Sequence, residues 1–362
     1  MRQQLIRFQQ ALTARNLDGA VVAAPETLSS VNLRYLSGFT GSSAYLVVSQ
    51  DRAWLLTDFR YTEQAEQESP DFELIRHGPQ AADAIRELCT PHQLHRLGFE
   101  ADKVPVSMWH DWQNAIPAVW AALDGLIEDL RRVKTAEEIA LLKNAARIAS
   151  DALLEILPGM VGKSEREVAL DLELAMRRRG AEALAFSTIV ASGERGSMPH
   201  ASPTERRIQS GEFVTIDFGA KVNGYHSDET VTVATGPVAQ PLQEIYALVE
   251  RAQEAGIAAV KAGSRSHQVD EAARSIIEEA GYGEYFGHGT GHGVGLEVHE
   301  DPYAYPMRPG TPDWVLEPGM TITVEPGIYV PGLGGVRLED TLVVAVDGAE
   351  RLTQVPKHLR AV

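Results

Sequence analysis

The sequence contains a single cysteine, Cys89, among its 362 residues. One cysteine excludes an internal disulfide and zinc sites built from several thiolates, and it is typical of proteins from a reducing compartment. The stretch from Met1 to Phe8 lacks the apolar core of a signal peptide. No window approaches the ~20 apolar residues that a membrane-spanning helix needs. We therefore predict a cytoplasmic protein.

Positive charge is also scarce, because 33 lysines and arginines stand against 50 acidic residues and give a net charge of -17. This balance argues against nucleic acid or an anionic membrane surface as a partner. The apolar fraction of 44% and the charged fraction of 23% are those of an ordinary globular protein. The length favours two domains.

The first third of the chain alternates between helical and strand patterns. Leu5, Phe8 and Leu12 follow helical spacing, and a second helix is expected over residues 81–88. Strands are expected at residues 19–24, 44–48, 53–58 and 96–100. Strands that alternate with helices predict a smaller α/β domain over residues 1–131.

The rest of the chain, residues 132–362, is predicted to form a second domain. Thr135 and Glu138 form a capping box, which starts a helix that stops before Pro158. The pattern of two helices followed by an antiparallel hairpin then occurs twice, which predicts a duplicated α+β domain. The remaining helices are expected at residues 164–179, 240–262 and 266–280, and the strands at 187–191, 211–218, 227–234, 295–299, 321–330 and 336–346.

Residues 287–300 place three histidines, His288, His292 and His299, among five glycines. Glycine disfavours a helix and lets backbone approach a neighbour or an ion closely. Histidine is the commonest protein metal ligand and a frequent proton carrier. The spacing does not fit the dinucleotide-binding fingerprint. Taken alone, the stretch is compatible with a metal or acid/base site and also with a plain glycine-rich turn.

Four acids, Asp217, Asp228, Glu325 and Glu339, lie in or beside apolar strands of the two predicted hairpins. A carboxylate that faces a protein core is costly unless something neutralises it, and a divalent cation would do so for several acids together. Four carboxylates and one imidazole suit Mn²⁺, Fe²⁺, Co²⁺ or Zn²⁺. Two such ions could hold a bridging hydroxide and polarise a carbonyl, which indicates hydrolysis.

These motifs resemble those of the pita-bread metallopeptidases, the superfamily of methionine aminopeptidase, prolidase and aminopeptidase P. The matching motifs run in family order through the second domain: Ile216-Asp217-Phe-Gly, Ser227-Asp228, Gly291-His292-Gly-Val-Gly, Val298-His299-Glu300, Val324-Glu325-Pro-Gly and Arg337-Leu-Glu339-Asp340. Residues 32–42 resemble the creatinase/prolidase N-terminal domain. The resemblance implies an α+β pita-bread catalytic domain preceded by a smaller α/β creatinase/prolidase-type domain.

The resemblance also implies a role for each of the five ligands in a dinuclear site. Asp217 would bind one ion and His292 the other, while Asp228 and Glu339 would bridge them. Glu325 would bind the ion held by His292 and act as general base. Two divalent ions are expected, with Mn²⁺ as the first choice and Co²⁺ or Zn²⁺ as alternatives.

Four further residues match positions around the active site of the family. His200 and His299 would hydrogen-bond the scissile carbonyl and the tetrahedral intermediate, where developing charge makes such bonds valuable. His288 matches a further active-site histidine, either beside the metal ligands or on the substrate side. Arg337 resembles the arginine that supports the bridging acid in this family.

Two departures from the family pattern are visible. The family often reads Ser-Asp-Ile-Thr-Arg-Thr after the second aspartate, whereas this chain has Glu229 and Val231 at the variable positions. This difference concerns the packing behind the ligands. There is also no clear equivalent of the arginine with which some prolidases hold a dipeptide carboxylate, since Arg308 lies nearby without a motif. The second gap favours cleavage of longer peptides.

We therefore predict a dinuclear-metal aminopeptidase that removes the N-terminal residue from Xaa-Pro peptides. The alternative is an Xaa-Pro dipeptidase (prolidase). A non-catalytic pita-bread binding module and a metal-free creatinase are disfavoured, because both predict the loss of ligands and all five are present. The family implies a homodimer. The native metal and the strictness for proline stay open.

Overall fold

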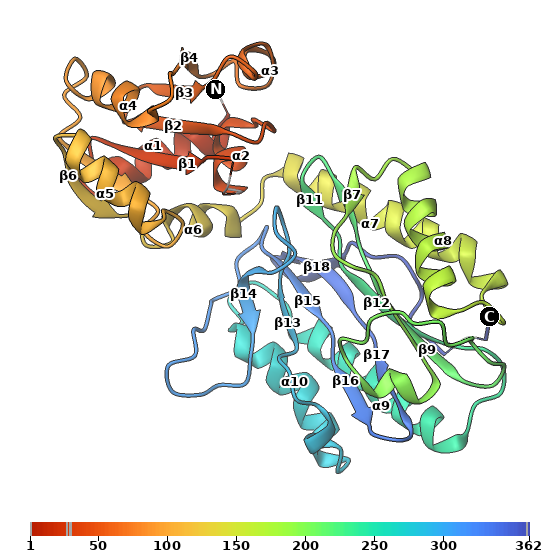
Figure 1. Ribbon diagram of the computed structural model, residues 1–362. Helices are drawn as coiled ribbons and strands as arrows, with labels where there is room; N and C mark the ends of the chain where they lie inside the picture. Colours follow the sequence, from red (N-terminus) through yellow and green to blue (C-terminus); the bar gives the residue numbers. More distant parts are fainter. Residues whose placement is uncertain (1, 27, 29–30, 360) are drawn as a thin grey trace. The chain divides into compact units, whose positions relative to one another are not determined.

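The structure, a computed structural model, describes residues 2–26, 28, 31–359 and 361–362. The chain divides into two compact units, Met1–Arg131 and Arg132–Val362 (Figure 1). In the part of the chain that is described, no helix is both long and apolar enough to cross a membrane. Helices and strands are mixed in both units, which confirms the predicted α+β class.

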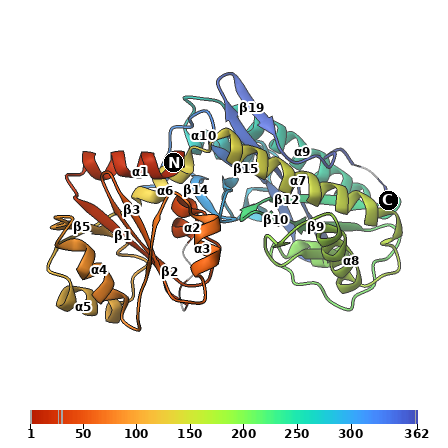
Figure 2. The same ribbon diagram turned by 90° about the horizontal axis from the view of Figure 1, so that it is seen from above.

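The first unit is built around one six-stranded sheet with the strand order β4-β3-β2-β1-β5-β6. Strand β1 pairs antiparallel with β2 and parallel with β5, so the sheet is mixed. Helices α4 and α5 pack on one face, while α1 and α2 contact β1 and β2 (Figure 2). Every residue of β1 is buried, as expected for a strand covered on both faces. The elements are α1 (Gln3–Ala14), β1 (Gly19–Ala24), α2 (Val31–Ser37), β2 (Ala44–Ser49), β3 (Ala53–Thr57), α3 (Thr62–Glu68), β4 (Glu73–Arg76), α4 (Ala81–Cys89), β5 (Arg96–Phe99), α5 (Val106–Ala115), β6 (Val119–Ala122) and α6 (Leu126–Arg132).

The second unit repeats a pair of helices followed by short antiparallel strands. Its first half contains α7 (Ala136–Ile156), η1 (Leu157–Gly159), α8 (Glu165–Arg178), β7 (Ala183–Leu184), β8 (Ile189–Ser192), η2 (Gly193–Ser197), β9 (Phe213–Phe218), β10 (Ala220–Val222), β11 (Tyr225–His226) and β12 (Glu229–Ala234). Its second half contains α9 (Gln240–Ala259), α10 (Ser266–Glu279), η3 (Gly283–Tyr285), β13 (Gly291–Gly293), β14 (Glu300–Ala304), β15 (Thr321–Val324), β16 (Gly327–Val330), β17 (Gly334–Arg337), β18 (Asp340–Ala345) and β19 (Gly348–Arg351).

The helix pairs cover the strands of their own halves. Helices α7 and α8 pack against β8, β9 and β12, and α9 and α10 pack against the strands from β15 to β18 (Figure 1). The predicted capping box of Thr135 and Glu138 is present, with both reciprocal hydrogen bonds. A turn forms at Asn223-Gly224, where both residues have positive φ and β10 pairs with β11 across it.

Two long strands predicted in the second half are each broken in two. The segment 321–330 divides into β15 and β16 at Glu325-Pro326, because Pro326 has no N–H for a ladder and Glu325 N donates to Thr290 O instead (2.7 Å). The segment 336–346 breaks directly opposite, at Leu338 and Glu339, into β17 and β18.

The prediction of a strand over residues 295–299 is wrong. This segment is a series of bends in which Gly295 N donates to Glu297 O (2.9 Å). The strands that pair here are its neighbours, β13 and β14. A side chain at Gly293 would lie 2.5 Å from Asp301 O, so the two strands approach at a distance that only glycine allows.

Candidate active site

The second unit contains a cavity of about 370 Å³. All nine site residues predicted from the sequence line it: His200, Asp217, Asp228, His288, His292, His299, Glu325, Arg337 and Glu339. They come from segments that lie more than a hundred residues apart in the chain. The structure therefore gathers into one cavity the residues that the motifs predicted as a set.

Backbone pairing places the first pair of acids. Asp217 lies in β9 opposite Thr230 of β12, and Asp228 immediately precedes β12. Strand β12 is tied in turn to the second hairpin, because Glu339 N donates to Thr230 O (3.0 Å). Thr341 Oγ1 also donates to Asp228 O (2.7 Å). The two acid-bearing hairpins are thus joined by direct hydrogen bonds beside the cavity.

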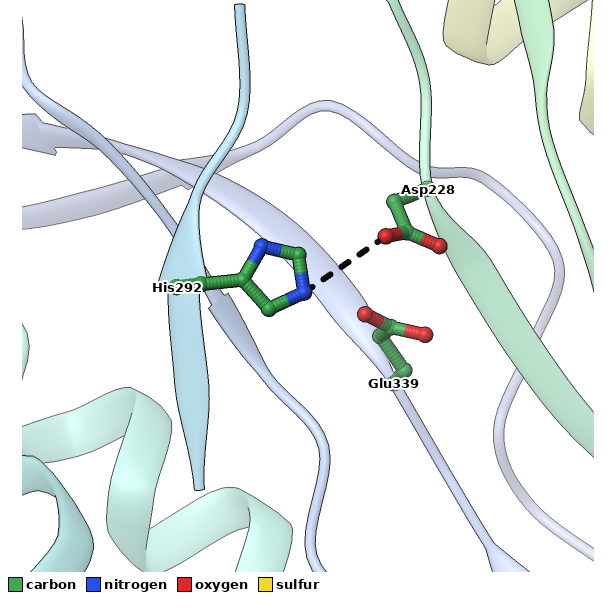
Figure 3. Close-up of side chains that lie close together, drawn as sticks. All are labelled: Asp228, His292 and Glu339. Carbon is green, nitrogen blue, oxygen red and sulfur yellow. Dashed lines mark ion pairs between the residues drawn. The ribbon is translucent and has the colours of Figure 1, made fainter. Parts of the chain in front are cut away.

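The glycines of residues 287–295 position His292. A side chain at Gly291 would lie 1.9 Å from Thr323 O, so β13 can approach β15 only with glycine at this position. The backbone N–H of His292 donates a hydrogen bond to Thr323 Oγ1 (3.0 Å), which holds this residue in place. Its Nδ1 lies 3.0 Å from Gly293 O, which leaves Nε2 directed toward the carboxylates of Asp228 and Glu339 (Figure 3).

Three of these side chains form a cluster that can hold a metal ion. Asp228, His292 and Glu339 each offer one ligand atom, and the three atoms lie within 4.8 Å of one another (Figure 3). His292 Nε2 lies 3.6 Å from Asp228 Oδ2 and 3.3 Å from Glu325 Oε1. Among the described residues, Asp217 Oδ1 and Glu339 Oε1 have no hydrogen-bond partner although both atoms are buried. Asp217 lies outside this three-residue cluster but lines the same cavity, and buried carboxylate oxygens without donors in a cavity that also holds an imidazole fit a divalent cation.

The electrostatics of the cluster support the same conclusion. Burial raises the pKa of Asp228 well above its usual range, and the neighbouring carboxylate of Glu339 adds to this effect. Burial likewise raises the pKa of Glu339, with a further contribution from Glu325. Carboxyl groups in this setting resist ionisation unless a cation compensates them. A cation would remove both the burial cost and the repulsion.

Glu325 and His292 behave as an ion pair. Burial is the largest influence on the pKa of Glu325 and would raise it, but the hydrogen bond and charge of His292, together with the charges of His288 and Arg337, lower the pKa on balance. Burial would likewise lower the pKa of His292, but the hydrogen bond and charge of Glu325, with smaller contributions from Gly293 and Asp217, raise it on balance. Glu325 is therefore an ionised carboxylate inside the cavity, as a group that accepts a proton must be.

Arg337 has a different partner from the one that the resemblance implied. Its Nη2 donates to Asp217 Oδ2 (2.7 Å), and the structure shows no direct bond from Arg337 to Glu339. The link to Glu339 runs through Thr230, which receives a hydrogen bond from Arg337 Nε (3.2 Å) and donates to Glu339 Oε2 (2.7 Å). Arg337 thus orients acids of both hairpins, one directly and one through a hydroxyl.

Tyr329 was not found from the sequence. Its hydroxyl lies 2.8 Å from His288 Nε2 and accepts a hydrogen bond from Arg337 Nη1 (3.2 Å). Burial lowers the pKa of His288, which keeps this imidazole neutral. A tyrosine in an apolar strand such as β16 is indistinguishable from a core residue by pattern. No signal in the sequence marks its contact with His288.

His299 and His200 also line the cavity. The ring centre of His299 is 4.3 Å from that of His292, and burial together with His292 lowers the pKa of His299. His200 is exposed at the cavity lining. Tyr303 and Tyr305, which sequence reasoning did not select, add a stacked aromatic wall with ring centres 5.0 Å apart.

Arg308 does not line this cavity. It lines a neighbouring cavity of about 480 Å³, which shares His288, Gly289 and Tyr305 with the first. The two cavities thus meet along a common wall.

Comparison with known proteins gives a consistent result over the whole chain. Residues 140–345 match metallopeptidase family M24, and residues 4–133 match the creatinase/prolidase N-terminal domain. An Xaa-Pro dipeptidase of Pyrococcus furiosus is 37% identical over 99% of this chain and 100% of its own. Among solved structures, an Xaa-Pro dipeptidase from Bacillus anthracis is 42% identical with a TM-score of 0.93, and an X-Pro aminopeptidase from Thermotoga maritima is 35% identical with a TM-score of 0.90, each with 99% of both chains covered.

Proposed function

The chain belongs to metallopeptidase family M24 and carries a creatinase/prolidase N-terminal domain, and from this premise we propose that it is an Xaa-Pro dipeptidase. It is a hydrolase with a pita-bread catalytic domain. The relatives named Xaa-Pro dipeptidase match it from end to end at 37% and 42% identity, and they support the dipeptidase alternative better than the aminopeptidase favoured from sequence. The absence of a motif around Arg308 was therefore a weak guide to peptide length.

The proposed cofactor is a pair of divalent ions, with Mn²⁺ as the first choice. The ions would be held by Asp217, Asp228, His292, Glu325 and Glu339. The observation that best supports this is that one buried carboxylate oxygen of Asp217 and one of Glu339 accept no hydrogen bond from the described residues. When bound, such ions lower the pKa of a water molecule and polarise the scissile carbonyl.

The remaining groups receive roles from their positions. Glu325 is ionised in the cavity and is the proposed general base. His299 and His200 are proposed to donate hydrogen bonds to the carbonyl oxygen as negative charge develops on it. The neutral His288, held by Tyr329, is proposed to contact the substrate directly.

The aromatic wall fits the proline side of the substrate. Tyr303 and Tyr305 present stacked rings to the cavity, and the pyrrolidine ring of proline is a compact apolar group that can pack on such faces. The peptide bond before proline has no N–H, and the proline ring fixes φ. Hydrolysis of this bond therefore calls for a dedicated site of this kind.

The proposal is tested by hydrolysis of Ala-Pro, Ala-Pro-Ala and Met-Ala-Ala. The full chain is stripped with a chelator and refilled with Mn²⁺, Co²⁺ or Zn²⁺, and products are separated chromatographically. We expect cleavage of Ala-Pro, dependent on added metal and lost in Asp228→Ala and Glu339→Ala. The exposed acid Asp347, changed to Asn, serves as the matched control that keeps full activity.

Other outcomes would replace the proposal. Preference for the tripeptide with proline second would restore the aminopeptidase assignment. Turnover of Met-Ala-Ala alone would indicate methionine-type specificity. No cleavage of any peptide by metal-loaded protein would favour a binding module. A homodimer remains a prediction, which sedimentation of the loaded chain tests.

A further inference from the structure

The residues that follow two of the proposed ligands are themselves buried acids. Glu229 follows Asp228 and Asp340 follows Glu339, and their exposed fractions are 0% and 2%. Successive side chains of an extended strand point to opposite faces. Asp228 and Glu339 line the cavity, whereas the two following acids do not, so Glu229 and Asp340 lie behind the strands that present the ligands.

Lys357 binds both of these acids. Its Nζ lies 2.6 Å from Glu229 Oε1 and 3.2 Å from Asp340 Oδ1, and it donates a third hydrogen bond to Val355 O (3.0 Å). An ammonium group has three donors, and all three are used. Lys357 is only 7% exposed, so these bonds form away from water.

The segment that carries Lys357 is anchored around it. Val355 N donates to Glu229 Oε1 (3.0 Å), and Tyr246 donates from its hydroxyl to Lys357 O (2.8 Å). Thr353 Oγ1 donates to Asp340 Oδ1 (2.6 Å). The ammonium group is therefore held at one position between the two acids.

We propose that Lys357 is a positioning residue of the metal site, which fixes the spacing of Asp228 and Glu339 by pairing with the acid that follows each of them. The inference rests on the proposed function because it assumes that these two acids share ions. It goes beyond the family match, which ends at residue 345 and so leaves Lys357 outside. It also gives a role to Glu229, one of the two residues at which the sequence departs from the common family pattern.

The physical basis is the balance of charge behind the strands. Glu229 begins β12 and Asp340 begins β18, and each directly follows an acid that lines the cavity. Without the ammonium group, two buried carboxylates would repel each other across the gap between these strands. The strands would separate, and the ligand atoms that now lie within 4.8 Å of one another would separate with them.

Binding of Mn²⁺ to the full chain tests this inference without any substrate. Isothermal titration gives the affinity and the number of ions, and electron paramagnetic resonance reports spin coupling between two ions that share ligands. We expect Lys357→Met to bind Mn²⁺ about 10- to 100-fold more weakly and to lose the coupled signal, as is typical when groups behind metal ligands are removed. Lys143→Met, which breaks an exposed ion pair with Glu350 by the same substitution, should bind like wild type.

A triple variant covers the case in which Lys357→Met does not fold. In Glu229→Gln/Asp340→Asn/Lys357→Met no buried charge is left uncompensated, but the ionic link between the strands is gone. We expect this folded variant to show the same loss of affinity and of coupling. Wild-type affinity and an unchanged spectrum in either folded variant would overturn the inference while leaving the proposed function intact. Failure of the wild-type chain to bind two Mn²⁺ ions would instead overturn both.

Discussion

Neutralising one ligand should stabilise the metal-free protein at alkaline pH. In the absence of metal, the carboxyl group of Asp228 is buried beside Glu339, and its pKa is raised well above the usual range. We therefore expect Asp228→Asn, which keeps the shape and removes the charge, to be more stable than the wild-type chain at pH 8 in the presence of a chelator.

The direction follows from proton linkage. A carboxyl group whose pKa is higher in the folded state binds its proton more tightly there than in the unfolded chain. Below the unfolded pKa, near 4, the group is protonated in both states and has no effect. Above that pH the unfolded chain releases the proton while the folded state still holds it, so stability falls as the pH rises, and the loss levels off once the pH passes the raised folded pKa. The variant has no such group, so its advantage grows from about pH 4 upward.

The distance in the cluster sets the magnitude. Ligand atoms of Asp228 and Glu339 lie within 4.8 Å of each other, and two unit charges at that separation repel by about 3 kcal/mol at an effective dielectric constant near 20. We expect the variant to gain on the order of 2–3 kcal/mol at pH 8 and less than about 1 kcal/mol at pH 4. Added Mn²⁺ should stabilise the wild-type chain and reverse the order.

The assay is urea unfolding followed by far-ultraviolet circular dichroism at both pH values. Tryptophan fluorescence is unsuitable because four of the five tryptophans, all but Trp314, lie in the first unit. Asp347→Asn, at an exposed position, is the control and should change little. If the metal-free Asp228→Asn chain were less stable than wild type at pH 8, the account of the cluster as strained by its own charge would be wrong.

Three further changes probe the groups around the ligands. Arg337→Met should weaken Mn²⁺ binding and lower kcat about 10- to 100-fold, because Asp217 loses its partner; titration of the metal and steady-state kinetics check this. Tyr329→Phe should lower kcat/KM about tenfold through loss of the bond to His288, while urea unfolding shows a change within about 1 kcal/mol. Gly291→Ala should abolish Mn²⁺ binding, because the new Cβ meets a backbone oxygen of β15 and displaces the histidine that follows; calorimetry measures it. In all metal-binding variants, affinity should rise with pH, since Asp228 and Glu339 release protons when the ion binds.

Local chemistry explains why much of the fold was predictable. Thr135 and Glu138 cap α7 through bonds within four residues of each other, and the turn at Asn223-Gly224 needs only residues that tolerate positive φ. The prediction of a strand over residues 295–299 was wrong because strand formation also depends on residues that are distant in the sequence. The alternation of apolar and polar residues there is typical of a strand, but a segment becomes one only where another strand pairs with it, and here the partner of β13 is β14.

The candidate site was predictable as a set of residues but not as a network. Acids inside apolar strands stand out because the sequence itself shows the cost of burying them. Tyr329 and Thr230 do not stand out, since tyrosine and threonine are ordinary strand residues. Their importance lies in what their hydroxyls contact, and only the fold brings Thr230 to Glu339, 109 residues further along the chain.

The breaks in the two strands of the second hairpin explain how acids can be both buried and accessible. Pairing runs from Val324 opposite Asp340 to Gly327 opposite Arg337, and Glu325 and Glu339 fall in the interval between these registers. In that interval the backbone N–H of Glu325 bonds to the segment of the glycines, and that of Glu339 bonds to β12. The two acids therefore lie between the paired strands β15 and β18 and the paired strands β16 and β17, where the glycine-rich segment and β12 also contact this hairpin. Because backbone bonds fix these positions, Gln at either position should leave the fold intact and remove only the charge that the ions need.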